Sequence, residues 1–435
     1  MTSWYSRFRH PWALGAAALA FAIVNVAIWW PGVFDSDSEG QLAQALAGSY
    51  DDWHPPIMAV IWACLGASAP AMLVLQSGLH WFGFWSLAES VRRKGRSPYH
   101  WAVLAVGLSP IALKFTGVFQ KDTLLESLFI AGFGLSSLKG GHVAGSFLGT
   151  VGMLCRGNAV FALPPLLFAR ARRMGLVRLV VLSVVIAAAL VPASAFVNHT
   201  VLNARRSGVE RSLQLFDIAG IAHFSHDASF LPKGAERAGE CYTPYFWDSF
   251  RPCGVPLIQL PPITGNWLSA IAAHPVAYAM HRIAHFNIAT FFAVPPMPQC
   301  VYAASQHQCE FTRTAVIKDF VAKNALLWPC LWLAIGLMFL LSNPERLPRN
   351  MAVSGLIYGL AYAVVSVASN FRYFYWTEIA VQAAIVYHLA SGGRLRWRPM
   401  VSAAAVILVI GYGARIALLG EVFTAASKAG TAFTG

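Results

Sequence analysis

Residues 13–56 read ALGAAALAFAIVNVAIWWPGVFDSDSEGQLAQALAGSYDDWHPP. The apolar run before Pro31 predicts a helix over about 12–30, long enough to cross a hydrocarbon core of roughly 30 Å. No small-residue cleavage site follows it, so we interpret it as a retained membrane helix and not as a signal peptide. The acidic segment 31–56 then lies where this helix surfaces. Several carboxylates and a His at such a position predict a reaction or binding site.

The rest of the chain repeats the apolar pattern. Its 435 residues are 57% hydrophobic and 12% charged, which is about half the charged fraction of an average soluble domain. Apolar runs of about 15–20 residues recur from end to end, each long enough to span a bilayer as a helix. We therefore predict an all-α polytopic membrane protein.

Basic side chains outnumber acidic ones and give a formal net charge of +13. Many of them stand in short clusters between apolar runs, which is typical of residues that set topology at the cytoplasmic face. This pattern argues against nucleic acid as a partner. Counting the runs between clusters gives about eleven transmembrane helices, with the N-terminus in the cytoplasm and the C-terminus outside. The clusters comprise Arg7, Arg9, Arg92, Arg93, Lys94, Arg96, Arg170, Arg172, Arg173, Arg178, Arg346, Arg349, Arg394, Arg396 and Arg398.

Three regions follow from this count. Residues 1–197 form an N-terminal transmembrane module with 31–56 as its outer loop, and residues 323–435 form C-terminal transmembrane helices. Between them, residues 198–322 hold prolines, aromatic residues and mixed charges but no clear apolar span. We predict a folded domain on the outer face. Its histidines are interpreted as structural or solvated: His223, His226, His274, His281 and His285.

Four of the seven cysteines fall in the predicted outer domain, at Cys241, Cys253, Cys300 and Cys309. Cysteines in an oxidising compartment are commonly paired. Four cysteines allow three connectivities, and of these we favour Cys241–Cys253 and Cys300–Cys309, which close two short loops. No array of Cys and His has the spacing of a zinc site.

Two stretches predict short helices. Ser36-x-x-Glu39 has the form of a capping box, and the apolar positions after it predict a helix over 38–48 that lies at the membrane surface. Residues 143–169 predict two short helices around Cys155-Arg156-Gly157-Asn158, each barely long enough to cross.

Asp35 and Asp37 are the candidate catalytic residues. A carboxylate can take the proton of an attacking hydroxyl group, and at a helix exit it can meet a phosphate at headgroup depth. An aspartate in this position can equally well cap the surface helix and complement its dipole. The residues alone leave both interpretations open.

Three further residues near the outer surface are candidate substrate ligands. His54 precedes a Pro pair that suits the first turn of a helix, but its ring can also face a substrate. Lys121 and Asp122 stand at another outer turn. They can form a structural ion pair at a helix start, or the lysine can bind a phosphate.

Two arginines complete the candidate set. Arg156 lies between two short apolar halves, where an arginine is costly unless it is paired or snorkels to the surface. Arg372 and Tyr373 lie at the outer end of a predicted span. The arginine can hold a phosphate with two N–H groups, whereas tyrosine at that depth belongs by default to an interfacial aromatic belt. Glu378, two turns on, is a possible partner of Arg372.

These motifs resemble the GT-C superfamily of membrane glycosyltransferases. The matching stretches are PG-x-x-DS and G-x-Y-x-DWHPP in the outer loop, KDTLL at 121–125, C-RGN at 155–158 and FRYFYW at 371–376. An acidic motif after the first span, a surface helix and then His-Pro-Pro are similar to the motifs of protein O-mannosyltransferases and aminoarabinose lipid A transferases. This combination of motifs resembles that of a bacterial branch of GT-C-like membrane proteins.

The resemblance implies a GT-C-like bundle that takes a sugar from a polyprenyl-phosphate donor. The acceptor is a lipid, a glycan or a protein on the periplasmic face of the bacterial inner membrane. The general base falls on Asp35. In the family the second acid directly follows the first. Here Ser36 stands between them, so Asp37 is the expected second acid. His54 matches the histidine of the family. Members with and without a divalent metal exist, so no metal ligand is assigned.

The lipid-phosphate site follows from chemistry more than from motif. Lys121, Arg156 and Arg372 carry the positive charges that a departing phosphate needs, with Asp122 and Tyr373 beside them. The predicted reaction is an inverting displacement, in which the base deprotonates the acceptor hydroxyl group and that oxygen attacks C1 of the sugar.

Two other classes of function compete with this one. A transporter or flippase of a lipid-linked sugar would suit charged residues at broken helices, but the sequence shows no internal repeat and its acids gather on one face. A ligase or polymerase of surface polysaccharide would also use polyprenyl donors. Formation of a new glycosidic bond would exclude transport as the sole function.

Overall fold

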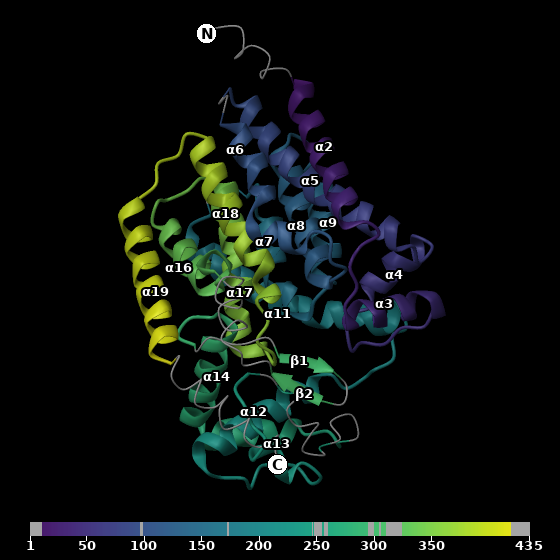
Figure 1. The fold of residues 1–435 in the computed structure, drawn as a ribbon, viewed down its shortest axis with the longest axis vertical. Helices are drawn as coiled ribbons and strands as arrows, with labels where there is room; N and C mark the ends of the chain where they lie inside the picture. The colour runs from purple at the N-terminus through teal and green to yellow at the C-terminus, as the bar shows by residue number, and fades with distance from the viewer. Residues whose placement is uncertain are drawn as a thin grey trace.

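The computed structural model describes residues 11–95, 99–171, 174–245, 247, 255, 260–294, 300–303, 306–309 and 324–418. Within these ranges the fold is α-helical, as the sequence predicts (Figure 1). The longer helices are α2 (Pro11–Trp29), α3 (Ser36–Ala47), α5 (Ala69–Arg93), α8 (Lys121–Ser137), α9 (His142–Met153), α11 (Leu176–Phe196), α12 (Glu210–Ser225), α13 (Thr264–Ala273), α14 (Pro275–Ala289), α16 (Pro329–Leu340), α17 (Arg346–Val365), α18 (Tyr375–Ala390) and α19 (Trp397–Ala417). Shorter helical segments are α4 (Ile57–Cys64), α6 (His100–Ala105), η1 (Val106–Leu108), α7 (Pro110–Phe115), η2 (Gly157–Phe161), α10 (Leu163–Leu167), η3 (Val197–Val201), η4 (Glu236–Gly239), η7 (Ala325–Leu327) and η8 (Phe371–Phe374). The strands β1 (Cys300–Ala303) and β2 (Gln306–Cys309) form an antiparallel hairpin.

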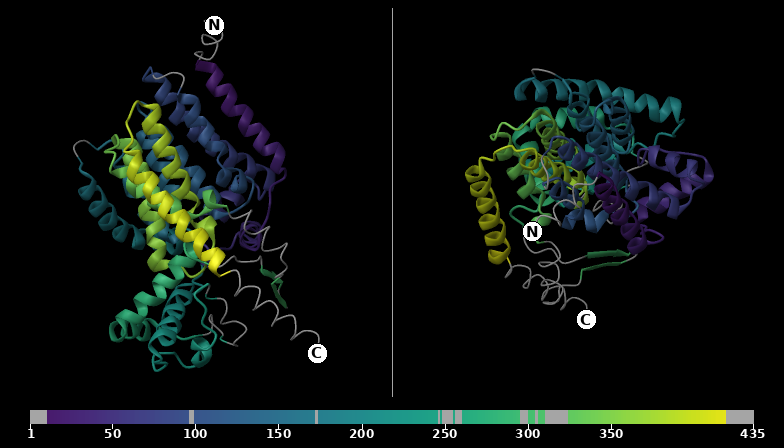
Figure 2. Two further views of the ribbon diagram at one scale, coloured as in Figure 1. Left: turned by 60° about the vertical axis from the view of Figure 1, so that its left-hand side comes forward. Right: turned by 90° about the horizontal axis from the view of Figure 1, so that it is seen from above.

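Three described helices are long and apolar enough to cross a membrane: α2, the Leu176–Val201 helix made of α11 and η3, and α19. A fourth is counted if α4 and α5, which meet at an angle of 112°, form one broken span. Figure 2 shows α11 and α19 on the outside of the bundle, where large apolar side chains such as Val185 and Val409 stay exposed. Such faces suit contact with lipid. The number of eleven spans, their orientation and the inner-membrane location remain predictions.

Glycines bring the central helices into close contact. A Cβ on Gly83 of α5 would lie 2.6 Å from backbone atoms of Ile130 and Ala131 in α8. A Cβ on Gly132 of α8 would lie 2.7 Å from the carbonyl oxygen of Gly145 in α9. Small residues at such contacts let helix backbones approach closely, which is the usual packing of membrane helices. The helices α5, α8 and α9 therefore pack closely. Their close packing fixes the position of α8, whose first residue is Lys121.

Several apolar runs are broken into shorter helices. The apolar run at about 100–115, which the sequence predicts as one of the eleven spans, consists of α6, η1 and α7. Ser109 has an extended backbone before Pro110. A residue before proline is disfavoured from the helical conformation, which accounts for the break. Residues 143–169 contain α9, η2 and α10, the divided arrangement predicted around Cys155–Asn158.

Helices α12, α13 and α14 gather at the end of the molecule away from the N-terminus and have a core of their own (Figure 1). This unit belongs to the predicted domain 198–322, whose position outside the membrane remains a prediction. Cys241 is disulfide-bonded, and its predicted partner Cys253 lies outside the described residues. The predicted pair of Cys300 and Cys309 occupies opposite positions in the backbone register of the hairpin.

Candidate functional site

The acidic loop begins with a helix cap. We predicted a capping box from Ser36 to Glu39, but the structure shows that Asp35 caps α3. Its Oδ1 accepts a hydrogen bond from the backbone N–H of Ser38 at 2.9 Å, and the Ser38 hydroxyl accepts one from the backbone N–H of Asp35 at 2.7 Å. Asp35 has the extended backbone of an N-cap residue, and aspartate is among the preferred caps. The prediction of Ser36 was wrong by one residue.

Backbone hydrogen bonds join this loop to the turn before α8. Val33 exchanges two of them with residues 117–119, of 3.0 and 2.9 Å. Gly32 has a φ of +109°, and a Cβ there would collide with the ring of Phe119. Glycine alone adopts this conformation readily and leaves room for the ring. The short bridge therefore brings Asp35 to the N-terminal end of α8.

Arg372 joins the two loop aspartates from η8, near the end of the chain. Its Nη1 donates to Asp35 Oδ2 and its Nη2 to Asp37 Oδ2, both at 2.7 Å. The Oδ1 of Asn370 accepts the backbone N–H of Arg372 at 3.1 Å and so fixes the turn. The Arg372 side chain is 13% exposed, whereas those of Asp35 and Asp37 are 27% and 28% exposed. The guanidinium fork thus holds together two carboxylates that would otherwise repel each other.

Lys121 and His54 approach Asp37 from the other side. Lys121 Nζ lies 2.5 Å from His54 Nδ1, and His54 Nε2 lies 3.4 Å from Asp37 Oδ1. An ammonium group can only donate, so Nδ1 accepts and Nε2 carries the proton that faces Asp37. Burial lowers the pKa of His54, although its hydrogen bond with Asp37 acts in the opposite direction. The ring is therefore neutral near pH 7, in agreement with this tautomer.

The surrounding charges set the protonation of Asp37 and Lys121. Burial alone would raise the pKa of Asp37. The hydrogen bond from His54 and the charges of Lys121 and Arg372 outweigh it and hold this pKa well below its usual range. Lys121 is the first residue of α8 and lies outside the candidate spans. Burial, together with the charge of Arg156, lowers its pKa to about 7, although Asp37 acts in the opposite direction.

Arg156 approaches the same place from the segment before η2. Its guanidinium forms an ion pair with Asp122 Oδ1 and lies 4.1 Å from the centre of the Tyr373 ring. The Asp122 side chain is nearly buried, and its Oδ2 lies 3.9 Å from Nε of Arg372. Neither Asp122 Oδ2 nor Arg372 Nε has a hydrogen-bond partner among the described residues. Asp122 therefore stands between two guanidinium groups with one oxygen left for a further contact.

All eight residues predicted to be catalytic or substrate-binding lie in this one cluster, which we call the loop cluster. Its members are Asp35, Asp37, His54, Lys121, Asp122, Arg156, Arg372 and Tyr373. It contains three carboxylates, two guanidinium groups, the Lys121 amine and a neutral histidine, so its charges balance without a ligand when Lys121 is protonated. A phosphate could enter by replacing a carboxylate as the partner of a cation.

Two contacts differ from the prediction or were missed by it. Glu378 does not pair with Arg372, because Glu378 is fully buried in α18 and its carboxyl oxygens have no hydrogen-bond partner among the described residues. Gln120 was not predicted, yet its Nε2 donates to Asp35 Oδ2 at 2.6 Å. A glutamine before Lys-Asp has no property that would have indicated this contact.

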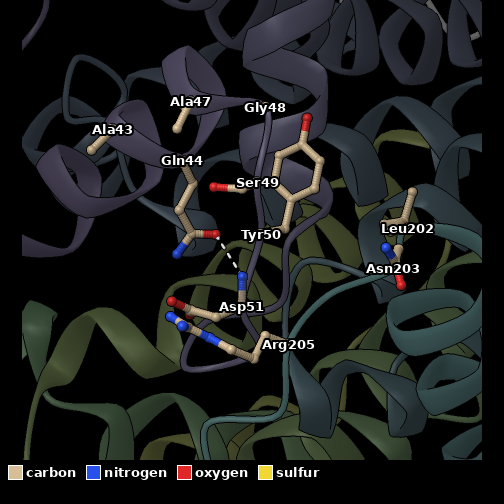
Figure 3. A pocket seen from close by; sticks show the side chains of 10 residues that line it. All are labelled: Ala43, Gln44, Ala47, Gly48, Ser49, Tyr50, Asp51, Leu202, Asn203 and Arg205. Carbon is tan, nitrogen blue, oxygen red and sulfur yellow. Dashed lines mark hydrogen bonds between the residues drawn. The ribbon is translucent and has the colours of Figure 1, made fainter.

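A cavity of about 580 Å³ lies between the second half of α3 and the segment after η3, and no residue of the loop cluster lines it (Figure 3). Figure 3 shows Asp51 beside Arg205, with Gln44 Oε1 accepting the backbone N–H of Asp51 at 3.1 Å. Asp52 accepts two hydrogen bonds of 2.6 Å from Ser207. Asp51 and Asp52 therefore attach the end of the loop to the segment after α11 and do not join the loop cluster.

Comparison with known proteins does not identify a relative: no family model, no curated protein and no solved structure matches this chain. Within the described ranges, no three His, Cys, Asp or Glu side chains are grouped so that they could hold a metal ion.

Proposed function

We propose that this protein is an integral membrane glycosyltransferase of the GT-C type. In this proposal it moves a sugar from a polyprenyl-phosphate donor to a lipid, glycan or protein acceptor. The observation that carries the proposal is the loop cluster, where three aspartates and three cations converge from α3, α8, η8 and the segment before η2. The reaction needs a base for the attacking hydroxyl group and positive charges for the departing phosphate, and the loop cluster offers both.

Arg372 and Lys121 are the best-placed ligands for the phosphate. Arg372 presents two parallel N–H groups to the loop aspartates, and the same fork fits two phosphate oxygens. The Lys121 ammonium is 3.9 Å from the nearer oxygen of Asp37, so a donor phosphate need only displace a loose contact. Arg156, held against Asp122 and the Tyr373 ring, adds a fixed positive charge.

We assign the general base to Asp37, although the resemblance points to Asp35. Both oxygens of Asp35 are engaged, because Oδ1 caps α3 and Oδ2 accepts from two side chains. Asp37 has one close partner, Arg372, and a long contact to His54. When a phosphate shares the charges of Arg372 and Lys121, the influences that keep the pKa of Asp37 low are weakened. Donor binding would thus make Asp37 a better base.

The proposed reaction is an inverting single displacement. The acceptor oxygen forms a bond to C1 of the sugar while the bond from C1 to the phosphate oxygen breaks. Polyprenyl phosphate leaves with the electron pair and is stabilised by Arg372 and Lys121. The hydroxyl proton passes to Asp37, which the Nε2–H of His54 keeps in orientation.

The proposed topology has about eleven spans, with the loop cluster and the α12–α14 unit on the periplasmic side of the inner membrane. The N-terminus is cytoplasmic and the C-terminus periplasmic. In Figure 1, the end of α5 and the start of α19, which carry basic residues, lie at the end of the bundle nearer the N-terminus, and α3 lies farther from it. Clusters of basic residues at that end of the bundle support this orientation, because such clusters are typical of the cytoplasmic face.

The test compares envelope lipids and glycans by mass spectrometry in a deletion strain that carries the wild type, a variant or an empty vector. Asp37→Asn should reduce sugar transfer by about 10²–10⁴-fold, the usual contribution of a general base. Asp35→Ser retains a capping side chain and should reduce transfer less. Glu39→Gln is the matched control, because Glu39 is exposed on the same helix turn and lies outside the loop cluster.

Transfer at the wild-type level by Asp37→Asn would refute the assignment of the base. Loss of transfer in Asp35→Ser alone, with unchanged thermal unfolding, would return that role to Asp35. If the purified protein moved lipid-linked sugar across proteoliposomes and formed no glycosidic bond, a transporter or flippase would replace the enzyme.

A further inference from the structure

A second polar cavity lies at the far end of α8 from the loop cluster. α8 begins at Lys121, in the loop cluster, and ends at Ser137, which lines a cavity of about 660 Å³. A helix of this length places its two ends about 25 Å apart. The cavity lies where the ends of α5 and α8 meet the start of α17 and the turn that follows α10. None of the residues of the loop cluster lines it.

Three cations from distant parts of the sequence line this cavity: Lys94, Arg170 and Arg346. Nε of Arg170 donates to the backbone carbonyl oxygen of Ser136 at 3.1 Å, a contact that leaves its charge unneutralised. Arg346 has no hydrogen-bond or ion-pair partner among the described residues. Lys94 Nζ lies 3.3 Å from Oε2 of Glu345, the one carboxylate in the wall. Among the described residues of the wall, three cations and one carboxylate leave a net charge of +2.

The remaining polar groups of the wall are hydroxyl groups that already have partners: Ser137 Oγ donates to the carbonyl oxygen of Gly134 at 2.6 Å, and the Tyr387 hydroxyl lies 3.0 Å from Ser90 Oγ. Ser137 and Tyr387 both line the cavity, and Lys94 Nζ lies 5.0 Å from the centre of the Tyr387 ring. Arginine and lysine side chains are usual ligands of phosphate oxygens, so the three cations carry the recognition. The volume lies within the usual range of about 300–1,000 Å³ for small-molecule sites, so there is room for more than a single ion.

We propose that this cavity binds a phosphate-bearing ligand at the end of the bundle opposite the loop cluster. Basic residues at this end of a membrane protein often serve only to orient it. Here three of them converge on one concave wall with a single counter-charge, whereas Arg394 and Arg398, at the same end, do not line it. The phosphate can belong to a lipid headgroup of the adjacent leaflet or to a solute. The proposal does not depend on sugar transfer.

The test measures binding to the purified full-length protein in nanodiscs of phosphatidylcholine. Inorganic phosphate is titrated by calorimetry, and added phosphatidylglycerol is followed by native mass spectrometry. The wild type should bind at least one probe saturably. Arg346→Gln should weaken that binding roughly tenfold, the loss expected for a hydrogen bond to a charged group. Lys94→Gln should act in the same direction. Arg394→Gln, an exposed arginine outside the wall, is the control and should bind like the wild type.

The two probes separate the sources of the phosphate. Saturable binding of phosphatidylglycerol alone would assign the cavity to a lipid headgroup, and binding of inorganic phosphate would assign it to a soluble ligand. The proposal is overturned if neither probe binds saturably. It is also overturned if Arg394→Gln weakens binding as much as Arg346→Gln, because the effect would then be that of surface charge in general.

Discussion

The loop cluster and a second polar cluster use the same kinds of side chain but differ in access. We call the second one the Asp217 cluster, formed by Asp217, Tyr242, Trp267, His281 and Arg282. Trp267 Nε1 donates to Asp217 Oδ2 at 2.8 Å, and His281 Nε2 lies 3.1 Å from Asp217 Oδ1. The Tyr242 hydroxyl lies 2.8 Å from His281 Nδ1, and Arg282 Nη2 lies 2.5 Å from Asp217 Oδ1. The side chains of Asp217 and His281 are completely buried.

The difference shows how a structural carboxylate and a candidate catalytic one are distinguished. Asp217, on α12, is enclosed by partners from α13 and α14 and cannot meet a solute, so its role is to join these three helices. Burial lowers the pKa of His281, so the ring is a neutral donor. In the loop cluster, Asp35 and Asp37 keep more than a quarter of their side-chain surface exposed. A ligand-binding site needs charged side chains that a solute can reach, and the partly exposed carboxylates of Asp35 and Asp37 meet this requirement.

The largest expected effect concerns the Asp217 cluster. Asp217→Asn leaves the guanidinium of Arg282 buried without its counter-charge, and breaking such a pair from one side costs about 3–5 kcal/mol. We therefore expect a strong decrease in the free energy of unfolding and in the thermal unfolding temperature of the solubilised protein. Any loss of transfer should follow the loss of folded protein.

The control for this change is Asp227→Asn. Asp227 Oδ2 lies 2.9 Å from Nε2 of His274, but both side chains are about one-third exposed, and exposed pairs contribute little to stability. The unfolding temperature should not change. If Asp217→Asn unfolded at the wild-type temperature while Asp37→Asn unfolded earlier, the proposed roles of the two clusters would be reversed.

Much of the loop cluster could be predicted because its residues stand at places where charge is costly. Asp37, Lys121, Arg156 and Arg372 are charged residues at the ends of apolar runs, and a membrane protein tolerates such groups only when they are paired or useful. Their mutual contacts could not be predicted. Arg372 and Asp35 are separated by 337 positions, and nothing local to either residue indicates the other.

The errors have local physical causes. The capping motif places the N-cap on Ser36, but the cap is decided by which residue keeps an extended backbone, and this is Asp35. Hydropathy counts apolar residues and does not register bends. It therefore predicts one span at 100–115, where Pro110 divides the run, and does not indicate the 112° angle between α4 and α5. Glu378 follows Arg372 by two helical turns, yet its side chain is buried elsewhere in the bundle.

A second test weakens phosphate binding by the loop cluster without unfolding the protein. Arg372→Lys keeps the positive charge but cannot present two parallel N–H groups. We expect the KM for the donor to rise about tenfold, which corresponds to about 1.4 kcal/mol of lost phosphate binding. The unfolding temperature should change little, because the charge that balances Asp35 and Asp37 remains.

Steady-state kinetics with varied donor and fixed acceptor measure this effect. Arg394→Lys is the control, since Arg394 is exposed and lies outside the loop cluster. A decrease in kcat with an unchanged KM for the donor would place Arg372 beside the acceptor or the leaving oxygen instead of the ground-state phosphate.

The smallest expected effect is a change with pH in the KM for the donor, which arises from the titration of Lys121 in the loop cluster. Lys121 has a pKa of about 7, so it loses its positive charge as the pH rises through neutrality. The KM for the donor should therefore increase a few-fold between about pH 6 and about pH 8. The increase is limited because a bound phosphate favours the charged lysine. Lys121→Arg keeps its charge over this range and should give a flat profile. In the unfolded chain a lysine has a pKa of about 10.4, so above pH 7 the unfolded state holds this proton more tightly than the folded state does. The unfolding temperature of the wild type should therefore rise as the pH increases from about 7 to about 8, and that of Lys121→Arg should not. A wild-type profile as flat as that of Lys121→Arg would mean that the ammonium keeps its proton, and that the phosphate site is already fully charged before the donor arrives.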